Sequence, residues 1–353
     1  MRALLVTPFT PLSKNFASHR SAQGVIYADQ LKNAGINVHL AMTGKIPEDY
    51  NEFDEMYVYH GNDWFGTLNM FGGVKNYANI DSVIKISKFK GKVYSIGIEY
   101  PDYYTMLKDR VDKTPDAHPQ WRLVDWDGLL RLQKESKVVD PNFIRRYPYV
   151  SIGDSHAISM YRPGWMNISV PFKTLHGALS AGLKSFVPEG EYNDIEFYFG
   201  NIDVRHHFCR MPNPDDAVKK TVANYVHQAA QLATEKNCQV TLYELLPIED
   251  ESRKLPQTGY YKGRPFSGTR EQRDKIRLLF KEEMFKQCTT FYKNVKVFEW
   301  VDKITNSKGE LDFMYMEKPQ SVHLSREYYP HWQGKDWNER TPKTGNLLNQ
   351  FMC

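Results

Sequence analysis

A serine in a short polar segment is the first feature of this chain that could take part in catalysis. The segment Gly153-Asp154-Ser155-His156 directly follows the apolar run 149–152. A serine at such a strand-to-helix turn can expose its hydroxyl, and the helix N-terminus then favours negative charge that develops beside it. A serine in a turn also commonly caps a helix, so this segment alone does not establish catalysis.

A second polar segment, residues 197–207, runs from an apolar strand through Gly200 into a group of polar side chains. In parallel α/β sheets, ligands bind at the carboxyl ends of strands, which is where this group lies. Its charged and imidazole side chains are Asp203, Arg205, His206 and His207. A metal site would need further ligands that the sequence does not supply nearby, so we expect no bound metal.

A third feature, Ser321-Val-His323-Leu, contributes a histidine late in the chain. Together the three features resemble the SGNH, or GDSL-type, hydrolase family over about residues 148–330. The resemblance rests on motifs that occur in the family's order, which is more specific than any one motif. The five motifs are Gly153-Asp154-Ser155-His156, Phe199-Gly200-Asn201-Ile202-Asp203-Val204-Arg205-His206-His207, Leu246-Pro247, Gly268-Thr269…Arg273 and His323.

This resemblance implies a serine–histidine mechanism, with Ser155 as the nucleophile and His323 as its base. The backbone N–H groups of Ser155 and Gly177 would line the oxyanion hole, and a third donor would come from block 200–205. Hydrolysis of this kind requires no cofactor. The resemblance also places a further set of residues around the oxyanion and the substrate: Asp154, His156, Gly200, Asn201, Asp203 and Arg205.

Two positions depart from the family pattern. Ile202 stands where the family has an asparagine, so Arg205 would have to supply the oxyanion donor. Gln320 stands three residues before His323, where the family has an aspartate. A glutamine cannot stabilise an imidazolium as a carboxylate does, so Glu317 or a backbone carbonyl would have to orient the histidine.

Hydrophobic periodicity predicts two α/β domains that divide near residue 145. The expected fold is a pair of Rossmann-like three-layer domains: residues 1–145, and residues 146–353, which are similar to SGNH and include a C-terminal extension. Expected strands are 3–6, 36–40, 56–59, 92–98, 149–152, 195–199, 239–245 and 295–299. Expected helices are 21–34, 79–89, 215–236 and 269–288, and the Asp-, Pro- and Lys-rich stretch 101–125 is expected to be a loop.

Several stretches of the first half are similar to the N-terminal domain of GT-B glycosyltransferases, in particular that of phage DNA β-glucosyltransferases. That domain faces DNA, and an acidic residue after one strand activates a hydroxymethyl group on a base. Glu99 falls at this place, and glutamate can serve the same base chemistry. The similar stretches are 2–8, 30–39, 71–73, 90–94 and 119–130.

Three functions follow from these patterns. The first is a Ser/His acyl-transfer enzyme, an esterase or O-acyltransferase, acting on modified phage DNA or a glycan. The second is a glycosyltransferase that moves a sugar from a nucleotide-sugar donor to 5-hydroxymethylpyrimidines in phage DNA. The third is a non-catalytic binding module. Double-stranded DNA would bind through the first domain, and a small molecule or sugar would be the substrate.

Composition limits the setting in which the protein acts. The 353 residues carry 46 Lys+Arg and 42 Asp+Glu, a formal net charge of +4, which is too small to indicate nucleic-acid binding by itself. The four cysteines form no CxxC pair, which favours reduced thiols and a cytoplasmic location, in an infected host if a phage encodes the protein. No run of about 18 apolar residues occurs, so we expect no membrane partner.

Overall fold

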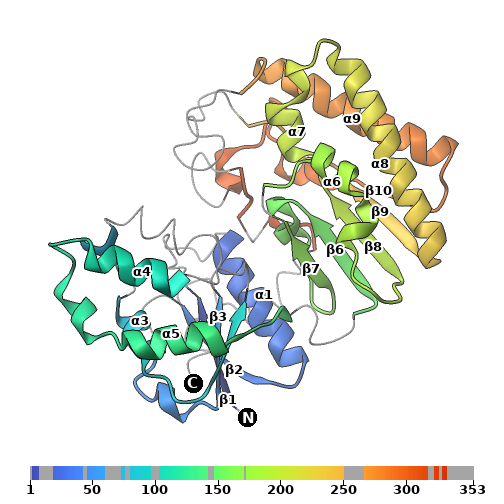
Figure 1. Ribbon diagram of the computed structural model, residues 1–353. Helices are drawn as coiled ribbons and strands as arrows, with labels where there is room; N and C mark the ends of the chain where they lie inside the picture. The colour runs from blue at the N-terminus through green and yellow to red at the C-terminus, as the bar shows by residue number, and fades with distance from the viewer. Residues whose placement is uncertain are drawn as a thin grey trace. The chain divides into compact units, whose positions relative to one another are not determined.

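The computed structural model places two parallel α/β sheets in one chain (Figure 1). The main division of the chain lies between Arg145 and Arg146, and it gives two compact units. The structure describes residues 2–7, 19–42, 46–59, 73–75, 80–96, 103–141, 147–170, 172–249, 266–316, 322–325 and 328–331.

The first unit contains a five-stranded sheet with the order β2-β1-β3-β4-β5, in which every neighbouring pair is parallel. Its strands are β1 (Arg2–Thr7), β2 (Asn37–Met42), β3 (Glu55–Tyr59), β4 (Lys92–Ile96) and β5 (Lys137–Val138). Its helices are α1 (His19–Asn33), α3 (Ile80–Ser87), α4 (Tyr103–Asp112) and α5 (Trp126–Glu135), with 3₁₀ turns η1 (Tyr50–Glu52), η2 (Gly73–Lys75) and η3 (Pro119–Leu123).

The core of the first unit follows from its central strands. Leu4 and Val6 in β1 and Val58 in β3 are fully buried, because parallel strands with neighbours on both sides carry near-continuous apolar runs. Helix α1 ends before Gly35, whose φ of +86° is a left-handed conformation that favours glycine.

The expectation of a loop over 101–125 is wrong. Helix α4 occupies Tyr103–Asp112, and it buries Tyr104 and Leu107 against the core. Its many charged residues form the solvated face, where Lys108 pairs with Asp112 one turn along. Helix α5 and the turn η3 were not expected either.

The second unit contains a five-stranded parallel sheet with the order β10-β9-β8-β6-β7. Its strands are β6 (Tyr149–Gly153), β7 (Met166–Ser169), β8 (Asp194–Tyr198), β9 (Gln239–Tyr243) and β10 (Val295–Phe298). Its helices are α6 (Leu175–Ala181), α7 (Asn201–His206), α8 (Pro214–Lys236) and α9 (Arg270–Thr290), and its 3₁₀ turns include η5 (Ser155–Met160), η6 (Leu183–Phe186), η7 (Phe208–Arg210), η8 (Val301–Ile304) and η9 (Phe313–Tyr315).

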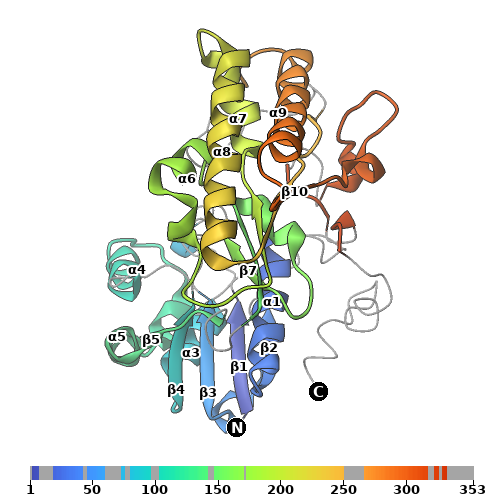
Figure 2. The ribbon, with the colours of Figure 1, turned by 90° about the vertical axis from the view of Figure 1, so that its right-hand side faces the viewer.

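The strand order of the second unit creates a crevice between β6 and β8. The chain leaves β6 towards β7 on one side, and it later continues from β8 through β9 to β10 on the other side. Helices α8 and α9 pack against each other on one face of the sheet (Figure 2). Ligands of such folds bind at the carboxyl ends of the two strands where the order reverses. The fold class predicted from the sequence, two parallel α/β domains, is confirmed.

Two glycines allow the strand ends at this crevice to approach. A Cβ on Gly153 would lie 2.3 Å from the backbone oxygen of Tyr198, so any other residue would push β6 away from β8. Gly200 has a φ of +117°, and a Cβ there would meet Leu245 and Phe280 at 3.3 Å. Gly153, at the start of the first polar segment, and Gly200, within the second, therefore both lie at positions that require glycine.

The described residues include no helix with both the length and the apolar character needed to cross a lipid bilayer.

Candidate active site

Ser155 and His323, which are 168 residues apart in the sequence, meet at the carboxyl end of β6. The Nε2 atom of His323 lies 2.9 Å from the Oγ atom of Ser155, within hydrogen-bond distance. Ser155 is the first residue of η5, and both side chains are partly exposed. A serine hydroxyl in contact with an imidazole is the arrangement that activates a nucleophile, because the imidazole can accept the hydroxyl proton.

A small pocket surrounds this serine–histidine pair. Its volume is about 10 Å³, close to the room that one water molecule needs. The lining residues are Ser155, His156, Ile158, Ser159, Leu246, His323, Leu324 and Tyr329. The sequence motifs singled out Ser155, His156, Leu246 and His323, whereas nothing in the sequence identified Tyr329 as part of the site.

Asp154 and His156 flank Ser155 and contact each other. Oδ1 of Asp154 accepts a hydrogen bond from the backbone N–H of His156. The same oxygen lies 2.8 Å from the Nδ1 atom of the His156 ring. The backbone bond caps η5 and fixes the turn that carries Ser155. Asp154 is fully buried and His156 is nearly so.

Asp203 lies in the first turn of α7 and reaches the first turn of α6. Its carboxylate accepts hydrogen bonds from the backbone N–H groups of Leu175 at 2.7 Å and His176 at 3.3 Å. Burial raises the pKa of Asp203 to about 6, although these two hydrogen bonds favour the ionised form. Asp203 therefore joins two helix ends, and it does not line the pocket.

The expected oxyanion donor Gly177 makes a different contact. Its backbone N–H donates to the Oγ1 atom of Thr174 at 3.0 Å, which caps α6. In this structure the Gly177 N–H is thus committed to its own helix, an arrangement that favours a structural role.

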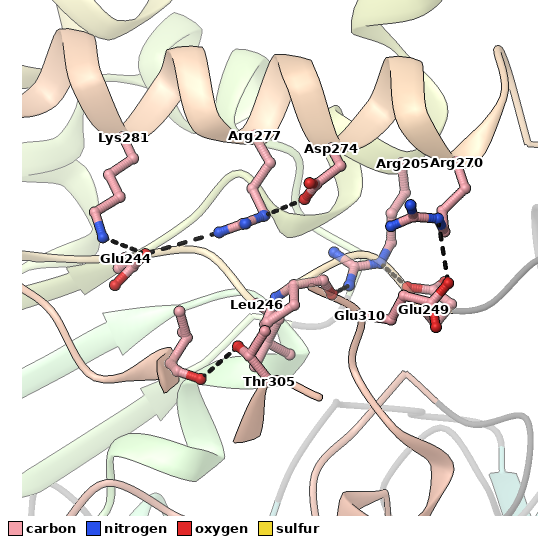
Figure 3. A network of polar contacts seen from close by, with 12 residues as sticks. Arg205, Glu244, Leu246, Glu249, Arg270, Asp274, Arg277, Lys281, Thr305 and Glu310 are labelled. Carbon is pink, nitrogen blue, oxygen red and sulfur yellow. Dashed lines mark hydrogen bonds and ion pairs between the residues drawn. The ribbon is translucent and has the colours of Figure 1, made fainter. Parts of the chain in front are cut away.

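Arg205 holds α7 to the chain that follows β9 (Figure 3), and Asn201 makes a further contact to the same chain segment. The Arg205 guanidinium donates to Glu249 through Nε at 2.8 Å, to the carbonyl of Pro247 through Nη2 and to the carbonyl of Asn201 through Nη1. The Asn201 side-chain oxygen accepts from the backbone N–H of Leu246. With every guanidinium nitrogen engaged and its side chain 2% exposed, Arg205 is a buried structural link, not an available oxyanion donor.

A second part of the same network fixes the end of β9. The buried Glu244 forms an ion pair with Lys281, with 2.8 Å between Nζ and Oε1. Nη1 of Arg277 lies 3.7 Å from the same oxygen (Figure 3). The backbone N–H of Trp300 donates to the Glu244 carboxylate, and its indole N–H donates to the Glu244 backbone carbonyl. These contacts anchor the segment that presents Leu246 to the pocket.

The segment 328–331 is held against the ends of β9 and β10. The His331 ring forms a hydrogen bond with the Tyr243 hydroxyl. It also stacks on the Phe298 ring, with 5.4 Å between the two ring centroids. Burial, with a smaller contribution from Arg162, lowers the pKa of His331 to about 4, so the ring is neutral near pH 7. This anchor lies two residues from Tyr329 of the pocket wall.

Of the residues expected around the substrate, the structure brings Ser155, His156 and His323 together at the pocket. Gly177, Asn201, Asp203 and Arg205 support the surrounding elements and are absent from the described lining. Glu99 of the first unit lies outside the described residues, as do Gln320 and Glu317.

Solved structures of low sequence identity are similar to this chain. One is a GDSL-like lipase from Bacteroides thetaiotaomicron, with 16% identity over 53% of this chain and 87% of that one and a TM-score of 0.38. Another is a protein assigned as an acylhydrolase from Bacteroides fragilis, with 16% identity over 51% and 80% of the two chains and a TM-score of 0.37.

The DNA-modifying enzyme β-glucosyltransferase is also similar, with 9% identity over 81% of this chain and 93% of that one and a TM-score of 0.25. Both families that the sequence motifs resemble are thus represented among these structures. At TM-scores this low, the similarity by itself assigns no activity. No protein-family model matches the sequence, and no curated protein matches it.

Proposed function

We propose that the second unit is a Ser/His-dependent acyl-transfer enzyme, an esterase or an O-acyltransferase. The observation that carries this proposal is the 2.9 Å contact between His323 Nε2 and Ser155 Oγ. It lies in a pocket next to the carboxyl end of β6, at the crevice where parallel α/β folds bind ligands.

The chemistry needs only groups of this chain and the substrate. His323 Nε2 takes the hydroxyl proton as Ser155 Oγ bonds to the acyl carbon, and the proton then passes to the leaving alcohol. The acyl–Ser155 ester is next attacked by water or by an acceptor hydroxyl. His323 accepts the proton of that nucleophile and returns it to Ser155, so the enzyme is regenerated without a cofactor.

The size of the pocket favours a short acyl group. A volume of about 10 Å³ beside Leu246, Leu324 and Tyr329 leaves no room for a long chain unless the wall moves. We therefore expect hydrolysis of p-nitrophenyl acetate to exceed that of the octanoate ester by about tenfold in kcat/KM, since fitting the longer chain would displace the packed wall at a cost of roughly 1–3 kcal/mol.

A fluorophosphonate probe tests the proposal because it forms a stable ester only with an activated serine. The wild-type protein should be labelled at Ser155, and Ser155→Ala should not be labelled. Ser180→Ala is the matched control, because Ser180 is an exposed α6 residue that donates to its own helix. A folded wild-type protein that shows no label on Ser155 would contradict the proposal.

A DNA glycosyltransferase that uses a nucleotide-sugar donor stays a prediction from the sequence, as does the binding of double-stranded DNA by the first unit. Its expected base, Glu99, lies outside the described residues. Nucleoside mass spectrometry of hydroxymethylcytosine DNA, after incubation with the protein and a panel of UDP-sugars, tests that function independently of Ser155. The natural acyl substrate, modified phage DNA or a glycan, is likewise a prediction.

A further inference from the structure

We propose that Asp154 and His156 together act as a positioning pair for His323. This inference rests on the proposed serine–histidine function, and it gives the two residues a role other than substrate binding. Asp154 orients the His156 ring, and that ring in turn orients His323 and stabilises its protonated form.

The first contact fixes the His156 ring. Asp154 Oδ1 lies 2.8 Å from His156 Nδ1, and the same oxygen accepts from the His156 backbone N–H. A carboxylate can only accept, so Nδ1 carries a proton, and in the neutral ring Nε2 is then an acceptor. Asp154 is 0% exposed and the His156 side chain is 4% exposed, so neither can reorient into solvent.

The second contact joins this pair to the catalytic histidine. The rings of His156 and His323 have their centroids 4.9 Å apart and are tilted by 38°. In the part of the chain that the structure describes, His156 Nε2 is a buried atom without a hydrogen-bond partner. The ring is therefore held by Asp154 on one side and faces the pocket, which it lines together with Ser155 and His323.

The negative charge of Asp154 is available to act through this ring. Its only described ion-pair partner is His156, and its second oxygen has no hydrogen-bond partner among the residues of known placement. A buried charge of this kind is poorly screened by solvent. Other described ionisable groups interact with Asp154: Tyr198 on β8, whose ring centroid lies 6.3 Å from that of His156, Asp203 on α7 and Tyr225 on α8.

These contacts give His323 a source of orientation and of charge stabilisation. When His323 takes the Ser155 proton, the resulting imidazolium lies beside a ring made electron-rich by a carboxylate, and cations are attracted to such rings. His156 itself takes no proton in the reaction. Its role resembles that of an outer partner that orients a ligand and raises its basicity.

Two substitutions test the contributions of Asp154 and His156 to the positioning of His323, and a third serves as the control. Asp154→Asn removes the charge but keeps an oxygen that can cap η5. His156→Asn keeps a side-chain donor near Asp154 but removes the ring that contacts His323. Asp194→Asn is the control, because it changes a partly buried carboxylate at the amino end of β8, away from the pocket, where it accepts from Thr241.

The rate of fluorophosphonate labelling of Ser155, measured from pH 5 to 9, tests the proposal. We expect Asp154→Asn and His156→Asn to lose roughly 10- to 100-fold in rate at pH 7, the scale of loss that follows from misplacing a catalytic group. The acid limb of the pH–rate profile should also move to lower pH in Asp154→Asn, a change that a merely structural role would not produce. A labelled wild type with an unchanged profile in Asp154→Asn would overturn the positioning role and leave the serine–histidine function standing.

An NMR titration of the His323 ring tests the same pair without any reagent. Its midpoint should fall by about one pH unit in Asp154→Asn, which corresponds to roughly 1.4 kcal/mol of lost stabilisation of the imidazolium, and should not change in Asp194→Asn. An equal midpoint in wild type and Asp154→Asn would refute the positioning pair. This measurement does not depend on labelling, so it tests the positioning pair even if the probe fails to label Ser155.

Discussion

Asp203 shows how one buried carboxylate can organise the surroundings of the site. It belongs to α7, yet it accepts two backbone N–H groups from the start of α6. The positive ends of both helix dipoles favour its charge, whereas burial opposes it. Burial prevails, and the pKa of Asp203 rises to about 6 from an ordinary value of 3.8.

This raised pKa predicts a pH-dependent stability. Between about pH 4 and pH 6 the folded protein holds a proton on Asp203 that the unfolded chain has lost. The free energy of unfolding should therefore fall by roughly 2–3 kcal/mol as the pH rises through this window. In Asp203→Asn that fall should be absent, as measured by urea unfolding at a series of pH values.

Asp216→Asn is the control for this experiment, because Asp216 is an exposed residue in the first turn of α8. It should keep the pH dependence of the wild type. Equal slopes in Asp203→Asn and the wild type would show that Asp203 is ionised in the folded protein throughout the window.

At the scale of single residues, motifs identified Ser155 and His323, which the structure brings into contact, but not the surrounding contacts. Ser155 and His323 could be predicted because each lies in a short, ordered motif. The role of Arg205 could not, because its partner Glu249 is 44 residues further along the chain and nothing local pairs them. The same holds for the contact between Asp203 and α6.

At the scale of elements, Gly200 determines how β8 passes into α7. Its φ of +117° would strain any L-residue, and a Cβ would also lie 3.3 Å from Leu245 and Phe280. We expect Gly200→Ala to lower the free energy of unfolding by about 2–4 kcal/mol, since backbone strain costs about 1–3 kcal/mol and overpacking adds to it.

Gly164→Ala separates the two causes. Gly164 has a comparable φ of +84°, but no atom lies within 4 Å of an added Cβ. This variant should lose only the strain energy, about 1–2 kcal/mol. Equal losses in the two variants, measured by urea unfolding, would show that packing against Leu245 and Phe280 adds nothing.

Long helices and strongly apolar strands could be predicted from the sequence, whereas the short helices and the strand β7 could not. Helices α8 and α9 span several turns, so their apolar positions repeat often enough to define a face. The four-residue strand β7 and the helices α6 and α7, of seven and six residues, contain too few repeats. In α4 the repeat was present at Tyr104 and Leu107, but the charged face obscured it.

At the scale of the whole molecule, each unit has its own sheet and its own buried core. We therefore predict two thermal unfolding transitions in calorimetry. Covalent labelling of Ser155 should shift only the transition of the second unit, because a ligand stabilises the part of the protein that binds it. A single transition that moves as a whole on labelling would contradict this independence.

The 168 residues between Ser155 and His323 also have a consequence for biosynthesis. The ribosome makes Ser155 and all five strands of its sheet before it makes His323. A nascent chain can thus complete the sheet while Ser155 still lacks this partner. Under the proposed function, the serine would gain its base only after the late segment has been made.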